Sequence, residues 1–377
     1  MLKKIYKYIA IIIVTIIISI GFTGSHSVQS VDDLAYVIAI GIDVGNKENL
    51  KVTFQFNMPS SSGESGAGES APSIIDSVEA SSIDSAINLM NVYVSKEMNL
   101  SHCKVIVISQ ELAQKGIGKE IYSLMNKVQI RPDNQVIISK VTAKEYIESV
   151  SPTLENLVAK FYEVLPTSGE YTGYTINAKL GEFFNQLICN TCEPTATLGN
   201  VVKEEEAEKT SEESGSSSGG SSSSDSSGSG EESNESLSAK NGVENLGVAV
   251  FKDDKLVGQL TAQETLAHLL LRNELKNCNI SIDDPENTNK KIDLYLISNH
   301  TARIDVNIIN GTPFIKVKII ANARISSIDD ISQEVTEERL SQIENSAANY
   351  LKELLYNYLF KTSKEYKSDI AGFGKYA

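Results

Sequence analysis

The chain has 377 residues, of which 41% are hydrophobic, and a formal net charge of -15. This length allows two or three domains with apolar cores, and four cysteines are too few for a small domain held together by disulfides. Because Lys and Arg are not clustered, the composition argues against nucleic acid as a partner.

The N-terminus carries an apolar run at residues 8–22, preceded by Lys3, Lys4 and Lys7. A basic start followed by an apolar run is typical of a signal peptide or a membrane anchor, which we assign to residues 1–24. Fifteen residues are short for a membrane span, which needs about 20. The lysines are expected to stay inside, so the rest of the chain would lie outside the membrane. Cleavage and retention of this segment both remain open.

The region from 32 to 200 reads as one or more mixed α and β domains. A β-branched apolar strand is followed by an alternating one, which predicts a hairpin, and a Ser/Gly-rich stretch at 59–73 predicts a mobile loop. The predicted strands are 34–44, 50–58, 104–109 and 135–139, and the predicted helices are 82–94, 116–128, 143–150 and much of 152–186.

Residues 203–240 form the clearest boundary. They carry a net charge of -7 and a long Ser/Gly tract. Such a composition cannot offset the entropy of ordering, so we expect a disordered linker between an N-terminal region, 32–200, and a C-terminal domain, 241–377.

The C-terminal domain begins with a predicted hairpin and helix and continues with further strands. Asn310-Gly311 marks a tight turn between two of the strands. Leu340, Ile343, Ala347, Tyr350, Leu354 and Tyr358 recur every three or four residues and predict a helix of about 35 residues. The predicted strands are 247–251, 255–260, 292–298, 302–309 and 314–320, with a first helix at 262–273. The expected fold class is α+β, and the C-terminal domain is an antiparallel sheet packed on the long helix.

Motifs that carry chemistry are few. Cys189 and Cys192 form a C-x-x-C pair, which favours a local disulfide or two thiols over a metal site or redox catalysis. Residues 116–119 lack the glycine and the hydroxyl residue of a phosphate-binding loop, and residues 215–219 match a nucleophile elbow only within the Ser/Gly tract. His268, within an apolar helical run, and His102 are predicted to be structural. We therefore predict no catalytic residues, no metal ligands and no cofactor, and assign no ligand-binding residues.

Short motifs in a constant order give the chain a family resemblance. It resembles the Ger(x)C family, the C subunits of spore nutrient-germinant receptors. The matching segments are Asp33-Leu34-Ala35, Gly41-Ile42-Asp43, Leu100-Ser101-His102, Glu111-Leu112-Ala113, Gly247 to Phe251, Lys255 to Gly258, Glu264-Thr265, Ser368-Asp369-Ile370 and Gly372-Phe373-Gly374.

Two features depart from the family pattern. The sequence ends at Ala377, just past Gly374, whereas the family usually continues into a final strand. Ser25 stands where the family has the lipobox cysteine, and a serine cannot form the thioether that holds the lipid. No lipidation is therefore expected, and the apolar segment becomes the expected means of attachment.

The resemblance implies a non-enzymatic subunit at the inner spore membrane that assembles with A-type and B-type receptor subunits to trigger germination by nutrients. Two alternatives stay open from the residues alone. One is a stand-alone envelope-anchored ligand-binding protein, and the other is a thiol-disulfide exchange protein that uses Cys189 and Cys192.

Overall fold

The computed structural model describes residues 2–21, 33–47, 49–57, 73–152, 155, 157–202, 242–298, 302–310, 312–329 and 336–376. Contacts divide the chain into two compact units, 1–34 and 35–377. The predicted linker 203–240, Ser25, and nearly all of the predicted loop 59–73 lie outside the described residues.

The first unit contains helix α1 (Leu2–Gly21), which covers most of the apolar run. By length and hydropathy, no helix within the described ranges meets the requirement for crossing a membrane.

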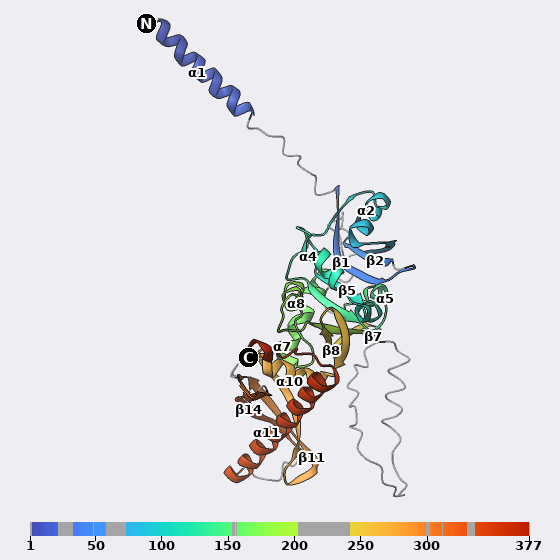
Figure 1. The fold of residues 1–377 in the computed structure, drawn as a ribbon, viewed down its shortest axis with the longest axis vertical. Coiled ribbons are helices and arrows are strands. Elements are labelled where there is room, and N and C mark those ends of the chain that lie inside the picture. Colours follow the sequence, from blue (N-terminus) through green and yellow to red (C-terminus); the bar gives the residue numbers. More distant parts are fainter. Residues whose placement is uncertain are drawn as a thin grey trace. The chain divides into compact units, whose positions relative to one another are not determined.

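The second unit is built on a sheet to which the described residues contribute nine strands (Figure 1). Its centre is parallel, because β1 pairs with β5, β5 with β6, and β6 with β7 in the same direction. The outer strands are antiparallel. The order β3-β2-β1-β5-β6-β7-β8-β9, with β4 also on β1, comprises β1 (Leu34–Val44), β2 (Leu50–Asn57), β3 (Ser73–Ala80), β4 (Glu97–Asn99), β5 (Val105–Ser109), β6 (Gln135–Ser139), β7 (Thr195–Val202), β8 (Gly242–Lys252) and β9 (Lys255–Leu260).

Helices cover both faces of this sheet, because the central strands are apolar on both sides. On β5, Ile106 and Ile108 belong to one buried cluster, while Val105 and Val107 belong to another that includes Tyr146 of α5. The helices of this region are α2 (Ile83–Tyr93), α3 (Gln110–Lys115), α4 (Gly118–Met125), α5 (Ala143–Ser149), α6 (Val158–Val164), α7 (Gly169–Thr172) and α8 (Leu180–Leu187), with a 3-10 turn at Leu165–Ser168.

The remainder of the second unit combines antiparallel strands with two helices, α10 (Ala262–Arg272) and α11 (Glu337–Phe360). β11 (Asn287–Ser298) lies between β10 (Asn277–Asp284) and β14 (Ala321–Ile328), and β12 (Arg303–Ile309) pairs with β13 (Thr312–Lys318) as a separate hairpin. Figure 1 shows α11 running along β11 and β14. The expected α+β class, with a C-terminal antiparallel sheet and a long helix, is confirmed.

Several details differ from the sequence predictions. Strands β3, β4, β7, β10 and β14 were not predicted. Helix α11 has 24 residues rather than about 35, because Thr336 caps its start by accepting a hydrogen bond from the backbone N–H of Arg339.

The central sheet also crosses the predicted boundary at 203–240. β7 and β8, one from each side of that boundary, pair antiparallel over residues 195–202 and 242–250. One buried apolar cluster extends from Ile40 of β1 to Ile343 of α11. The regions before and after this boundary therefore share one sheet and one apolar core.

Candidate functional site

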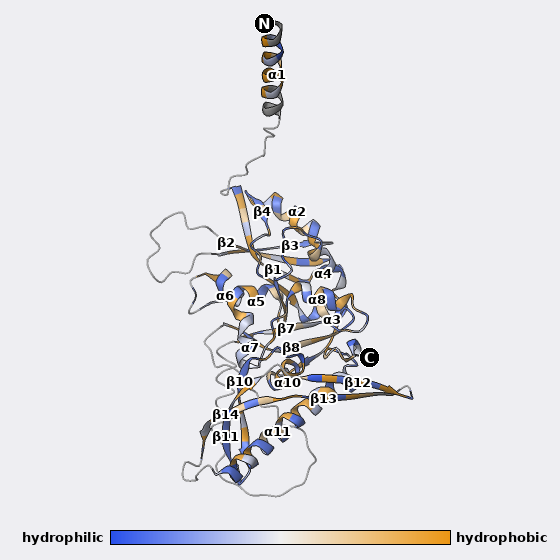
Figure 2. Cartoon of the chain, turned by 90° about the vertical axis from the view of Figure 1, so that its left-hand side faces the viewer, coloured by the Kyte–Doolittle hydropathy of each residue, from blue (hydrophilic) through white to orange (hydrophobic). Residues whose placement is uncertain are grey.

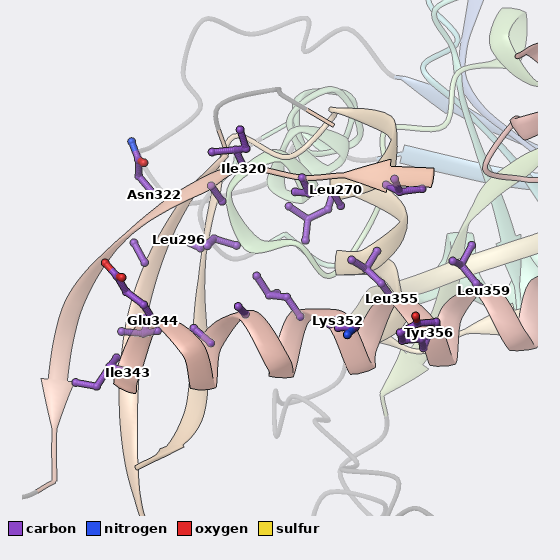
Figure 3. Close-up of a pocket in the computed structure, with 18 of the residues that line it drawn as sticks. Leu270, Leu296, Ile320, Asn322, Ile343, Glu344, Lys352, Leu355, Tyr356 and Leu359 are labelled. Atoms are coloured by element: carbon purple, nitrogen blue, oxygen red, sulfur yellow. The ribbon is translucent and has the colours of Figure 1, made fainter. Parts of the chain in front are cut away.

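A large concave feature of the second unit is an apolar groove between α11 and the strands β11, β13 and β14 (Figure 3). Its volume is about 990 Å³. A volume of this size is at the upper end of the range for small-molecule pockets and also suits a segment of another chain.

One wall of the groove is a stripe of α11. Ile343 and Ala347 are buried against the sheet, whereas Leu340 on the same helix remains 42% exposed. Ala348, Leu351, Leu355 and Leu359 also line the groove. The strands therefore cover only part of the apolar stripe of α11.

The opposite wall is formed by three strands. Leu294 and Leu296 of β11 are buried, and Ala323 and Ile325 of β14 lie beside them. Ile315 and Val317 contribute from β13. Figure 3 shows side chains from the strands pointing toward α11 across the groove.

Three charged residues line the groove, namely Lys316, Glu344 and Lys352. The other lining residues are mostly aliphatic, with Asn322 and Tyr356 as polar additions. This chemistry suits the binding of an apolar group with a few polar contacts around it.

Buried polar contacts hold α11 in place at both ends. Near its start, the guanidinium of Arg339 forms an ion pair with Asp284 at 3.0 Å, and both side chains are less than 5% exposed. Near its end, Tyr358 hydrogen-bonds through its hydroxyl to Nδ1 of His268 at 2.9 Å. Burial lowers the pKa of His268 to about 3, so the imidazole is neutral at ordinary pH. The helix wall of the groove is thus fixed to β10 and to α10.

The motif residues near the N-terminus have structural roles. Asp43 accepts hydrogen bonds from the backbone N–H groups of Ala143 and Lys144, at 2.7 and 3.1 Å, and so caps α5. Burial raises the pKa of Asp43, and the bonds from these two N–H groups lower it in part. A Cβ on Gly41 would lie 2.9 Å from Cδ1 of Ile147, so glycine permits α5 to approach β1 closely.

The C-terminal motif ties the end of the chain to the central sheet. The hydroxyl of Ser368 donates to the carbonyl of Phe251 at 2.5 Å. Asp369 accepts from the backbone N–H groups of Phe373 and Gly374, at 2.9 and 2.7 Å. The Ser-Asp and Gly-Phe-Gly motifs therefore have a structural role, because their hydrogen bonds fold the C-terminal tail and attach it to β8.

Cys189 and Cys192 are joined in a disulfide that closes the turn after α8. Cys103 and Cys278 are free and buried, and burial raises the pKa of both thiols to about 12. Unreactive thiols of this kind are typical of a packed interior.

The other residues that the sequence analysis considered for a functional site do not line the groove. His102 is exposed and stacks on Tyr36, with ring centroids 4.4 Å apart. Within the described ranges, no three His, Cys, Asp or Glu side chains come together as a metal site. The groove itself was missed by sequence reasoning, which placed α11 on the sheet but did not predict β14, one of its walls.

Comparisons with known proteins agree with the motifs. Residues 27–200 match the spore germination protein N-terminal domain, and residues 246–377 match the spore germination B3/GerAC-like C-terminal domain. The chain is 21% identical to spore germination protein KC of Bacillus subtilis strain 168, over 93% of this chain and 82% of that protein. A crystal structure of the GerBC protein is similar at 14% identity, with a TM-score of 0.49, covering 88% of this chain and 84% of that one.

Proposed function

Because this chain belongs to the GerAC family of spore germination proteins, we propose that it is a membrane-associated, non-catalytic subunit of a spore germinant receptor. It contributes to germination by assembling with A-type and B-type receptor subunits. Residues 32–200 and 241–377 correspond to its two GerAC-like regions, with 203–240 as a disordered linker.

The observation that carries the assembly role is the groove along α11. Its lining is mostly aliphatic, and the helix that forms one wall is anchored at both ends by buried polar contacts. A rigid, open apolar surface is suited to receiving an apolar segment of a partner, because burying that segment removes its surface from water without reorganising the groove.

The apolar N-terminal run is the proposed means of membrane association. It serves either as a signal peptide or as an anchor that keeps the second unit outside the membrane. The serine at position 25 supports attachment through this run rather than through a lipid.

A stand-alone ligand-binding role is the second candidate, favoured by the same groove. Its volume of about 990 Å³ is large enough for a small apolar ligand. This alternative predicts that the purified chain binds its ligand without other subunits.

Deletion of the gene, followed by a germination assay, tests the proposed function. We expect deletion spores to lose the response to at least one class of nutrient, such as amino acids or sugars, and to regain it when the full chain is restored. Unchanged germination with every nutrient tested would overturn the proposal.

A further inference from the structure

The hairpin of β12 and β13 has an apolar end that its own fold does not bury. Ile308 and Ile309 are 62% and 54% exposed, and Phe314 is 54% exposed. Figure 2 shows apolar residues at the end of this hairpin, away from the body of the second unit.

The apolar side chains at this end lie on both faces of the hairpin. Neighbouring residues of a strand point to opposite faces, so Ile308 and Ile309 are on different sides. Phe314 is paired with Asn307 and shares the face of Ile309. A protein surface packed on one face would require apolar residues on that face only, whereas an apolar medium suits apolar side chains on both faces, next to the polar turn residue Asn310.

Closer to the body, the hairpin is amphipathic. Ile304 and Val306 face Val317 and Ile315 across the strands on one side. The other side carries charged residues, and the hairpin, residues 303–318, contains three basic residues and one acidic residue, Asp305 opposite Lys316, a net charge of +2 in a chain of -15. This basic segment is therefore suited to a negatively charged partner.

One pair of charges points to an anion in particular. Arg303 and Lys318 are directly opposite each other in the ladder, and both are exposed. Like charges in this position repel each other. Within the described part of the chain, neither has an ion-pair partner, so a phosphate between them would relieve the repulsion.

The spacing of the two features fits a lipid surface. Phe314 and Lys316 are two residues apart on the same face, a distance of about 7 Å along the strand. The polar layer of a bilayer leaflet is roughly 5–8 Å thick, so Lys316 can remain among the headgroups while Phe314 reaches the acyl chains. The unpaired backbone groups at the hairpin edges keep such insertion shallow, because they cannot be left unsatisfied in hydrocarbon.

We propose that the β12–β13 hairpin inserts its apolar tip, Ile308, Ile309 and Phe314, into an anionic lipid surface, with Arg303, Lys316 and Lys318 at the headgroup phosphates. The apolar residues of this contact belong neither to the N-terminal run nor to the lining of the groove, although Lys316 also lines the groove. It gives the second unit its own attachment to a membrane, beyond the proposed role in receptor assembly.

An environment-sensitive fluorophore tests this contact in the full chain. Ile309→Cys introduces a thiol that can be labelled selectively, because Cys103 and Cys278 are buried and Cys189 is bonded to Cys192. The matched control is Val92→Cys on α2, where the native side chain is 86% exposed. Each labelled chain is mixed with vesicles of phosphatidylcholine alone or with phosphatidylglycerol added.

We expect a blue shift and a several-fold rise in emission for the label at 309 with phosphatidylglycerol vesicles only, and quenching by lipids that carry a doxyl group. The label at 92 should not change. A label at 309 that stays in water with both vesicles, or responds as the label at 92 does, would overturn the proposal. So would a shift that follows protein concentration without lipid, which would indicate a second copy of the chain.

Lys318→Glu provides a variant whose hairpin remains folded. It replaces the repulsion with Arg303 by attraction across the strands, so the hairpin itself should become more stable. The proposal expects the label at 309 to need several-fold more phosphatidylglycerol for the same shift, whereas an unchanged requirement would contradict it. Because none of these measurements involves another receptor subunit, their failure would leave the proposed germination role intact.

Discussion

Tyr366 lies directly against the α-carbon of Gly258, where a Cβ would come within 2.2 Å of the ring carbon Cζ. The hydroxyl of Tyr366 also donates to the carbonyl of Gln259 at 2.9 Å and accepts from its N–H at 3.3 Å. This contact connects the residues after α11 to β9, so Gly258 is required for the end of the chain to pack on the central sheet.

Gly258→Ala is expected to destabilise the protein by about 1–3 kcal/mol, because the added methyl group overpacks the contact with Tyr366. The smaller entropic gain from replacing glycine, about 0.4–1 kcal/mol, does not offset the clash. Urea unfolding measures the change. In the double variant Gly258→Ala/Tyr366→Ala the cost should be less than additive, and simple additivity would contradict the contact.

Asp43→Ala should lower the free energy of unfolding by about 1–3 kcal/mol, because two backbone N–H groups of α5 lose a charged acceptor. Asp43→Asn should cost less, since its carbonyl oxygen can still accept one bond. Asp133→Ala, at an exposed position before β6, is the matched control. Equal unfolding free energies for Asp43→Ala and the control would rule out the capping role.

His268 should make the protein less stable in acid. The pKa of His268 is about 3 in the folded chain and about 6.5 in the unfolded chain. Between pH 3 and pH 6.5 the unfolded state therefore binds a proton at this residue that the folded state does not bind. This contribution to stability is complete above pH 6.5 and is lost as pH falls, at up to about 1.4 kcal/mol per unit.

The pH dependence of urea unfolding for His268→Gln checks this prediction. Its stability should fall less steeply from pH 6.5 to 4 than that of the native chain. Asn349→Gln, which exchanges one side chain that does not titrate for another at an exposed position, should keep the native slope. Identical slopes for all three proteins would show that His268 does not titrate as its burial requires.

Thiol labelling separates a structural disulfide from a thiol-disulfide exchange site. With Cys189 and Cys192 bonded and Cys103 and Cys278 buried, the native chain should not react with maleimide. Urea should expose two thiols, and urea with a reductant four. Rapid labelling at position 189 or 192 in the native chain without reductant would favour the exchange protein instead.

The sequence predicted the parts of the fold whose residues repeat with a clear period. The buried strands β1, β5 and β6 and the stripe of α11 follow from runs of Val and Ile and from spacings of three or four. Strand β14, by contrast, reads ANARISSI, whose small and polar residues give little signal. It becomes a strand because β11 pairs with it, which is a tertiary effect.

The candidate site depended on that missed strand. The periodicity of α11 predicted an apolar stripe. It could not predict how much of that stripe the strands would leave exposed, because this depends on where the strands pack. In the same way, Gly-Ile-Asp was recognisable as a motif, whereas the partner of Asp43 lies 100 residues away along the chain.

The groove can be tested with a substitution that fills it. Ala348 is exposed and lines the groove, so Ala348→Trp should occupy the space without disturbing the buried face of α11. Asn349→Trp is the matched control, since it adds the same side chain at an exposed neighbouring position that does not line the groove. The free energy of unfolding of both variants, measured in urea, should lie within about 0.5 kcal/mol of that of the native chain.

Co-purification from spore membranes tests the central claim most directly. A tagged native chain and the Asn349→Trp control should each retain an A-type and a multi-span B-type receptor subunit, identified by mass spectrometry, whereas Ala348→Trp should lose them. A native chain that purifies from membranes without either subunit, while germination remains normal, would contradict the account.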